Sequence, residues 1–156
     1  MDKVSPPPQF TMLRRVQFSD TDMAGIVHFA NFYYYMEECE HEYFRSLGLS
    51  ISTTGPDGVT IGWPRVRASC GFESPARYDE LVEVRLYVAR KGVKSLTFDF
   101  EFWRDKTRLA RGTLKTVCCR FHPDRPIESI EIPPEFADKF VESAYRPDKS
   151  PSSRED

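Results

Sequence analysis

The distribution of apolar and polar positions predicts one early helix followed by a series of strands. Over residues 29–47 the apolar and aromatic residues recur at spacings of three and four, the pattern of an amphipathic helix. Gly48 follows the last periodic residue, where a helix ends at little conformational cost. Residues 20–27, just before the helix, are acidic and contain Gly25. The pattern therefore predicts an acidic loop that leads directly into a helix with an apolar face.

Most of the remaining chain alternates between apolar and polar positions, as half-buried strands do. The predicted strands are residues 10–19, 59–72, 80–90, 93–103 and 109–121. Gly62-Trp63-Pro64 disturbs the second of them, because proline cannot donate a hydrogen bond to a sheet. Residues 49–58 are rich in turn-forming residues. A short helix is expected over residues 134–143, since proline suits a first helical turn.

These elements fit one α+β domain over residues 10–143. Short turns between strands force antiparallel neighbours, and the helix at 29–47 is the one long helix available to cover the apolar face. We therefore expect a curved antiparallel sheet wrapped around one helix. Such a sheet leaves an edge and a face uncovered, which favours a homodimer or larger assembly. Residues 1–9 are expected to form a flexible arm and residues 144–156 a disordered tail.

Composition and charge narrow the classes of function. The chain has 156 residues, enough for one domain, and its formal net charge of −2 offers no basic field for nucleic acid. It has no apolar run long enough to span a bilayer and no charged-then-apolar leader, so we expect a cytoplasmic protein. The four cysteines follow neither a disulfide framework nor a zinc spacing, and the three histidines are scattered. Reduced thiols and no metal site are the expectation.

Residues 20–32, DTDMAGIVHFANF, resemble the signature of the 4-hydroxybenzoyl-CoA thioesterase family, which has the hot-dog fold. The resemblance covers about residues 10–140 and continues in YF at 43–44, LG at 47–48, PARYD at 75–79 and KS at 94–95. It implies a hot-dog dimer, often paired into homotetramers, that hydrolyses acyl-CoA thioesters. It implies no cofactor, because coenzyme A is part of the substrate.

The resemblance also implies roles for particular residues. The second aspartate of the family motif is catalytic, which assigns that role to Asp22, and a backbone amide near His28 and Phe29 would hold the oxyanion. Relatives usually have an aromatic-histidine or tyrosine pair where this chain has His28-Phe29, so His28 is a further candidate for orienting the carboxylate. The residues expected to contact substrate are Gly25, Val27, Asn31 and Trp63, with Arg90, Lys91, Lys94 and Ser95 near the phosphates of coenzyme A. Trp63 could equally pack in the core, and the basic cluster could be a solvated hairpin.

Elementary chemistry supports Asp22. Thioester hydrolysis needs a group that attacks the carbonyl or activates water, and donors for the resulting oxyanion. The first amides of a helix lack internal partners and carry partial positive charge. Asp22, just before such a helix, could act as general base or as nucleophile. Gly25 would let the backbone approach substrate closely, and Asp20 fits a structural role in the loop.

Three glutamates remain as alternatives. Glu40 falls in the middle of the apolar stripe of the helix, where a carboxylate must be paired, lie at an interface or have a raised pKa. We favour a salt bridge across a subunit interface over a catalytic role. If Asp22 is inert, Glu37, Glu40 and Glu73 are the next candidates.

Two other functions compete with acyl-CoA hydrolysis. A thioesterase acting on acyl carrier protein would need a basic docking patch, which this weakly acidic chain does not suggest. A non-catalytic acyl-CoA-binding protein would show binding without turnover. A hot-dog dehydratase is disfavoured, because no histidine stands where the opening motif would need a base. The sequence does not fix the acyl group.

Overall fold

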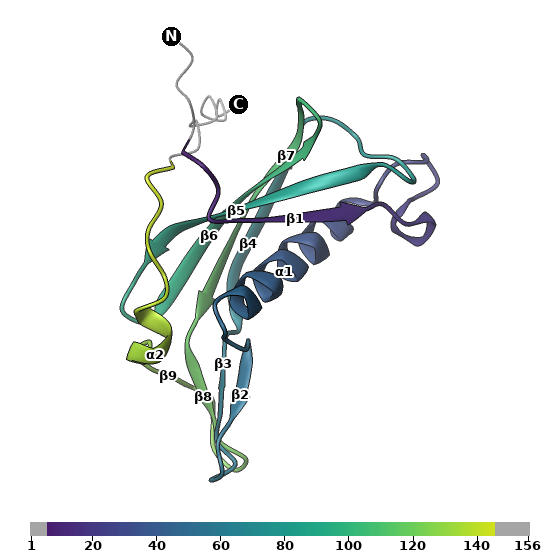
Figure 1. The fold of residues 1–156 in the computed structure, drawn as a ribbon. Helices are drawn as coiled ribbons and strands as arrows, with labels where there is room; N and C mark the ends of the chain where they lie inside the picture. Colours follow the sequence, from purple (N-terminus) through teal and green to yellow (C-terminus); the bar gives the residue numbers. More distant parts are fainter. Residues whose placement is uncertain (1–5, 146–156) are drawn as a thin grey trace, which may run out of the picture.

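The computed structural model describes residues 6–145 and shows a long helix held in the curve of an antiparallel sheet (Figure 1). Helix α1 spans Phe29–Ser46. The large sheet has the strand order β1-β5-β6-β7-β4, with β1 at Phe10–Arg15, β4 at Arg65–Phe72, β5 at Leu81–Lys91, β6 at Ser95–Arg104 and β7 at Thr107–Val117. The predicted α+β fold, a curved sheet around one helix, is confirmed.

A small second sheet projects beyond the C-terminal end of α1 (Figure 1). Its order is β2-β3-β8-β9, with β2 at Ser52–Thr54, β3 at Thr60–Gly62, β8 at Cys119–Phe121 and β9 at Glu128–Ser129. A 3-10 turn, η1, spans Phe18–Asp20, and a one-turn helix, α2, spans Pro134–Ala137.

Helix α1 packs closely on the sheet through its apolar stripe. Phe32 and Met36 are buried, and the Phe32 ring lies edge-on to Phe102 of β6 at 5.1 Å. Gly112 of β7 permits the close approach, because a Cβ atom there would lie 2.4 Å from the sulfur of Met36. The apolar residues whose spacing predicted the helix therefore form the face that packs on the sheet.

The structure divides two predicted strands. Trp63-Pro64 separates β3 from β4, and Cys118 separates β7 from β8, so in both cases one piece joins the small sheet. The paired breaks let β3 and β8 leave the large sheet together, with Gly62 opposite Cys119. Strand β2 lies within residues expected to form only turns, and the predicted helix at 134–143 is shorter than expected. All four cysteines are free.

Both ends of the described chain are tied to β5. Gln9 donates its amide to the carbonyl of Leu86 at 2.9 Å, so the part of the predicted arm next to β1 is anchored. At the other end Tyr145 is buried and stacks on Tyr87 at 3.9 Å, which extends the packed domain beyond residue 143. The rest of the predicted arm and tail, residues 1–5 and 146–156, lies outside the described residues. Among residues 6–145, every helix is too short or too polar to cross a membrane.

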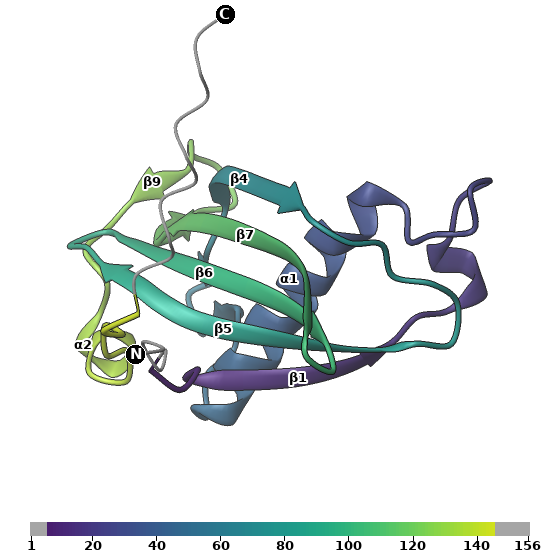
Figure 2. The same ribbon diagram turned by 90° about the horizontal axis from the view of Figure 1, so that it is seen from above.

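Strands β1 and β4 form the two edges of the large sheet (Figure 2). Among residues 6–145, strand β4 pairs only with β7, so one row of its backbone groups has no strand partner there. Its side chains are largely exposed, including Val66 at 57% and Phe72 at 50%. An eight-residue edge of this kind is a ready surface for pairing with another strand.

Candidate active site

The acidic loop before α1 is a tight reversal of the chain. Thr21 and Val27 form an antiparallel bridge, and the Asp22 amide donates to the carbonyl of Ile26 at 2.9 Å. Gly25, at φ +76°, adopts the left-handed conformation that the turn requires. Gly25 is exposed and does not line the cavity described below, and its predicted contact with substrate stays a prediction.

Asp22 faces a cavity of about 390 Å³ at the N-terminal end of α1. Its Oδ1 accepts a hydrogen bond from the Ala24 amide at 2.8 Å, which fixes the carboxylate. Aromatic rings of α1 and β4 form part of the wall, with Phe32 edge-on to Phe72 at 5.3 Å. The remaining lining residues are Ile26, Val27, Phe29, Glu73, Ser74 and Pro75. The cavity thus combines carboxylates with mainly apolar walls.

At the start of α1, one residue that lines this cavity, Phe29, has a backbone amide without a partner among the described residues. The Phe29 amide has no hydrogen bond to any residue within 6–145, whereas the Ala30 amide donates to Nδ1 of His28 at 3.1 Å. The His28 amide donates to the carbonyl of Asp20 at 2.9 Å. Of the two predicted oxyanion amides, that of His28 is therefore occupied within the chain, and that of Phe29 is free of a hydrogen bond to any described residue.

The side chain of His28 also has a structural partner. Its ring caps α1 and stacks on the Phe29 ring at 4.5 Å. His28 is exposed and does not line the cavity, so the structure does not bring it to Asp22 as a group that orients the carboxylate.

Two predicted substrate contacts lie elsewhere. Asn31 donates its side-chain amide to the carbonyl of Asp20 at 2.7 Å, because the loop folds back over the first turn of α1. Trp63 is buried against Phe44 and Phe136, each at 5.6 Å, near the C-terminal end of α1. Trp63 is thus a core residue, whereas Val27 does line the cavity.

Glu73 lines the same cavity as Asp22 but is held by two arginines. Arg108 donates to both its carboxylate oxygens, at 2.7 and 3.1 Å, and Arg111 lies 3.8 Å away. The hydrogen bonds from Arg108 lower the pKa of Glu73. A carboxylate stabilised in its charged form is a weaker base, which favours Asp22 for the chemistry.

Glu40 is fully buried away from the cavity and pairs within its own chain. Its Oε1 accepts from Nη1 of Arg65 at 2.8 Å, so the predicted salt bridge across a subunit interface is wrong. Its Oε2 has no hydrogen-bond partner among the described residues, and burial raises the pKa of Glu40 to about 7. Glu37 is half-exposed and lies 3.6 Å from Arg65. Neither glutamate lines the Asp22 cavity.

A separate basic hollow of about 340 Å³ contains part of the predicted phosphate cluster. Arg90 and Ser95 line it, together with Arg67 and Lys115, which strand pairing brings opposite one another. Lys91 instead donates to the carbonyl of Ala137 at 3.1 Å. Lys94 does not line the hollow either, so only Arg90 and Ser95 of the four predicted phosphate-binding residues lie there.

The basic hollow and the Asp22 cavity lie at opposite ends of the large sheet. Phe72, in the cavity wall, pairs with Ala110 of β7, which pairs in turn with Phe102 of β6. Ser95, which lines the basic hollow, lies seven residues before Phe102 on β6. At about 3.3 Å per residue this separation is roughly 23 Å along the strand. Within one chain, the two sites are therefore far apart.

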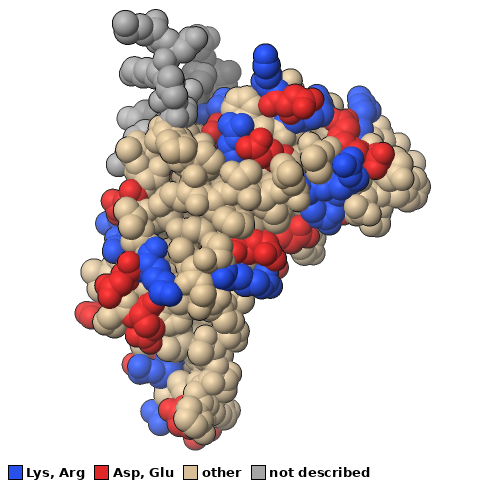
Figure 3. Space-filling view, in the orientation of Figure 1, with Lys and Arg blue, Asp and Glu red and all other residues tan. Residues whose placement is uncertain are grey.

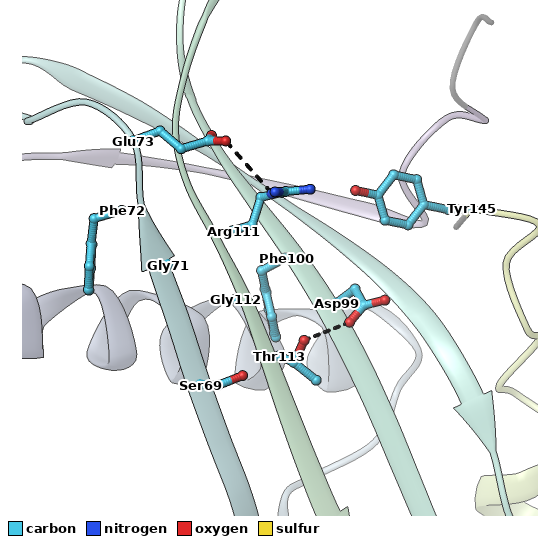
Figure 4. Close-up of a pocket in the computed structure, with 10 residues that line it drawn as sticks. All are labelled: Ser69, Gly71, Phe72, Glu73, Asp99, Phe100, Arg111, Gly112, Thr113 and Tyr145. Atoms are coloured by element: carbon cyan, nitrogen blue, oxygen red, sulfur yellow. Dashed lines mark hydrogen bonds and ion pairs between the residues drawn. The ribbon is translucent and has the colours of Figure 1, made fainter. Parts of the chain in front are cut away.

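A third hollow, of about 420 Å³, adjoins the Asp22 cavity through Phe72 and Glu73 (Figure 4). Arg111 lies against Glu73 there, and Thr113 donates to Asp99 at 2.8 Å.

The face of the molecule shown in Figure 3 carries both signs of charge interspersed, with no single basic field. Within residues 6–145 no three His, Cys, Asp or Glu side chains are placed to hold a metal ion.

Comparison with known proteins decides the family. The thioesterase superfamily matches residues 24–111, more than half of the chain. The chain belongs to this superfamily. The thioesterase superfamily assignment confirms the predicted hot-dog fold and the class of thioester hydrolases.

Individual relatives agree with this assignment. An Aquifex aeolicus protein named as an esterase is 32% identical over 106 residues, which cover 68% of this chain and 81% of that protein. The crystal structure of Slr0204, a 1,4-dihydroxy-2-naphthoyl-CoA thioesterase from Synechocystis, is 25% identical with a TM-score of 0.71, covering 83% of this chain and 93% of its own. BH1999, a gentisyl-coenzyme A thioesterase, is 28% identical with a TM-score of 0.72, covering 84% of this chain and 99% of its own.

Proposed function

We propose that this chain hydrolyses an acyl- or aryl-CoA thioester to the free acid and coenzyme A. The carrying observation is that the carboxylate of Asp22 and the unpartnered amide of Phe29 belong to residues lining one cavity. Asp22 acts as general base or nucleophile, and the Phe29 amide donates to the oxyanion. Such a donor contributes roughly 2.7–4 kcal/mol in measured cases.

The cavity walls favour an aromatic acyl group. The Asp22 cavity is lined by the aromatic residues Phe29, Phe32 and Phe72, together with Val27 and Pro75. Edge-to-face and offset contacts with such rings stabilise a planar aromatic guest beyond simple burial. The names of Slr0204 and BH1999 specify naphthoyl- and gentisyl-CoA, both aromatic thioesters. Aryl-CoA is therefore the first substrate class to test.

A homodimer would bring the two distant sites together. Two copies that pair antiparallel along β4 place the start of one β4 beside the end of the other. The basic hollow of one copy, lined by Arg67 and Arg90, would then approach the Asp22 cavity of its partner and bind the nucleotide phosphates. The exposed edge and the apolar Val66 and Phe72 support this pairing, and dimers could pair further into a homotetramer.

Arg90→Ala is expected to raise KM for acyl-CoA about tenfold, as the loss of one charge-assisted hydrogen bond predicts. The KM for the matching N-acetylcysteamine thioester, which lacks the nucleotide, should stay unchanged. Steady-state kinetics on both substrates measure the difference. Lys94→Ala is the control, because Lys94 lies in the same hairpin but outside the hollow. An equal change for both thioesters would contradict nucleotide binding by Arg90.

The function itself is tested by a panel of aryl-, short- and long-chain acyl-CoAs, with release of free thiol as the readout. We expect turnover, fastest for aryl-CoA. Faster hydrolysis of the same acyl group on acyl carrier protein would favour that carrier as substrate, and binding without turnover across the panel would favour an acyl-CoA-binding protein. The four free cysteines suit a reducing compartment such as the cytoplasm.

A further inference from the structure

Asp20, the first aspartate of the loop, is a buried carboxylate with three partners. It is 8% exposed, and its Oδ2 accepts hydrogen bonds from the Gln17 amide and the Tyr35 hydroxyl, both at 2.8 Å. Nη1 of Arg14 lies 3.5 Å from the same oxygen. A buried charge persists only when it is paired and hydrogen-bonded in this way. The side chain of Asp20 is therefore fixed to both β1 and α1.

The backbone of Asp20 closes the loop that carries Asp22. Its carbonyl accepts from the His28 amide at 2.9 Å and from the side chain of Asn31 at 2.7 Å. The two ends of the loop are thus held together at Asp20. The same bond occupies the His28 amide and leaves the Phe29 amide as the free donor at the cavity.

Tyr35 anchors this arrangement from two turns further along α1. Its ring is 1% exposed and lies under the guanidinium of Arg14 at 5.0 Å. Burial, together with the adjacent Asp20 carboxylate, raises the pKa of Tyr35, so the hydroxyl remains a proton donor. Neither Tyr35 nor Asp20 lines the Asp22 cavity, so any effect of the pair on the reaction must pass through the loop.

We propose that Asp20 and Tyr35 form a clamp that positions the Asp22 carboxylate and the Phe29 amide relative to each other. Both are positioning residues, and the proposal rests on the proposed thioesterase function. A misplacement of about 1 Å in a reacting group can cost about 100-fold in rate. The clamp fixes the one segment that carries both groups, so loosening it moves them while leaving the apolar walls in place.

The kinetic test compares Tyr35→Phe and Asp20→Asn with the unaltered protein on the best acyl-CoA of the panel. We expect kcat per folded protein to fall about 10-fold to 100-fold, with little change in KM, because positioning is lost and acyl binding is kept. Tyr43→Phe is the matched control, since Tyr43 is a buried tyrosine of α1 whose hydroxyl has no hydrogen bond within residues 6–145. Unchanged kcat in Tyr35→Phe and Asp20→Asn would overturn the proposal, as would an equal loss in the control.

Amide hydrogen exchange tests the clamp without relying on activity. In Tyr35→Phe the amides of Asp22 and His28 should exchange faster, while those of β6 keep their protection. Unchanged exchange at both loop amides would overturn the clamp, even if kcat fell. If the unaltered protein hydrolyses no acyl-CoA, the thioesterase proposal fails, and with it the positioning role. Faster exchange of the loop amides in that case would support only a structural role for the contact between Tyr35 and Asp20.

Discussion

Asp22→Asn is expected to lower kcat for acyl-CoA hydrolysis by about 10²- to 10⁴-fold, the usual contribution of a positioned acid-base group. Asparagine keeps an Oδ1 acceptor for the Ala24 amide, so the loop should retain its shape while the negative charge is lost. Thiol release measures the rate, and the thermal midpoint of unfolding checks that the fold is unchanged.

Asp57→Asn provides the matched control for this substitution. Asp57 makes the same kind of turn, with its Oδ1 accepting from the Val59 amide at 3.0 Å, but it lies in the hairpin of the small sheet. We expect its kcat to equal that of the unaltered protein. If Asp22→Asn stays active while Glu73→Gln is inactive, the chemistry belongs to Glu73, the other carboxylate of the cavity.

Arg65→Met is expected to destabilise the fold by about 3–5 kcal/mol near pH 8, because it leaves the buried Glu40 carboxylate unpaired. Near pH 5 we expect a much smaller loss, since Glu40 can take up a proton instead. Chemical denaturation of the variant and the unaltered protein at the two pH values gives the difference in free energy of unfolding.

The sign of this pH effect follows from the pKa of Glu40. Burial raises it from 4.5 to about 7, so the folded state binds a proton more tightly than the unfolded state does. The resulting stabilisation is full at acid pH and is lost as pH rises through about 7. Arg65 lowers the pKa of Glu40, so its removal raises this pKa further. In Arg65→Met the stabilisation by the bound proton is therefore lost over a range that reaches higher pH. Glu37→Gln, which alters an exposed neighbour of Arg65, should cost less than about 1 kcal/mol. Equal destabilisation by Arg65→Met at both pH values would contradict titration of Glu40.

Local patterns were sufficient to predict the centre of the fold. The spacing of apolar residues placed α1 to within one residue, and the acidic loop before it put Asp22 beside the start of the helix. Both features depend on neighbours in sequence. Periodicity also placed Glu40 within the apolar stripe of the helix, but its partner Arg65 lies on a strand 25 residues later, and helical spacing carries no information about that contact.

The remaining site depends on how strands pair and how the loop folds back. Arg67 and Lys115 join Arg90 only through the register of β4, β5, β6 and β7. Which amide at the start of α1 is free depends on the carbonyl of Asp20, a residue whose side chain accepts a hydrogen bond from Tyr35, 15 residues later. Helix-end chemistry predicts that several amides lack helical partners, but it cannot say which of them the loop satisfies.

The most direct test of the proposed site is a crystal structure with an aryl-CoA analogue in which a methylene group between sulfur and carbonyl prevents hydrolysis. We predict that the aromatic ring lies against the rings of Phe32 and Phe72, with the carbonyl oxygen accepting from the Phe29 amide and the Asp22 carboxylate facing the carbonyl carbon. An analogue bound with its carbonyl away from both groups would contradict the assignment of this cavity as the hydrolytic site.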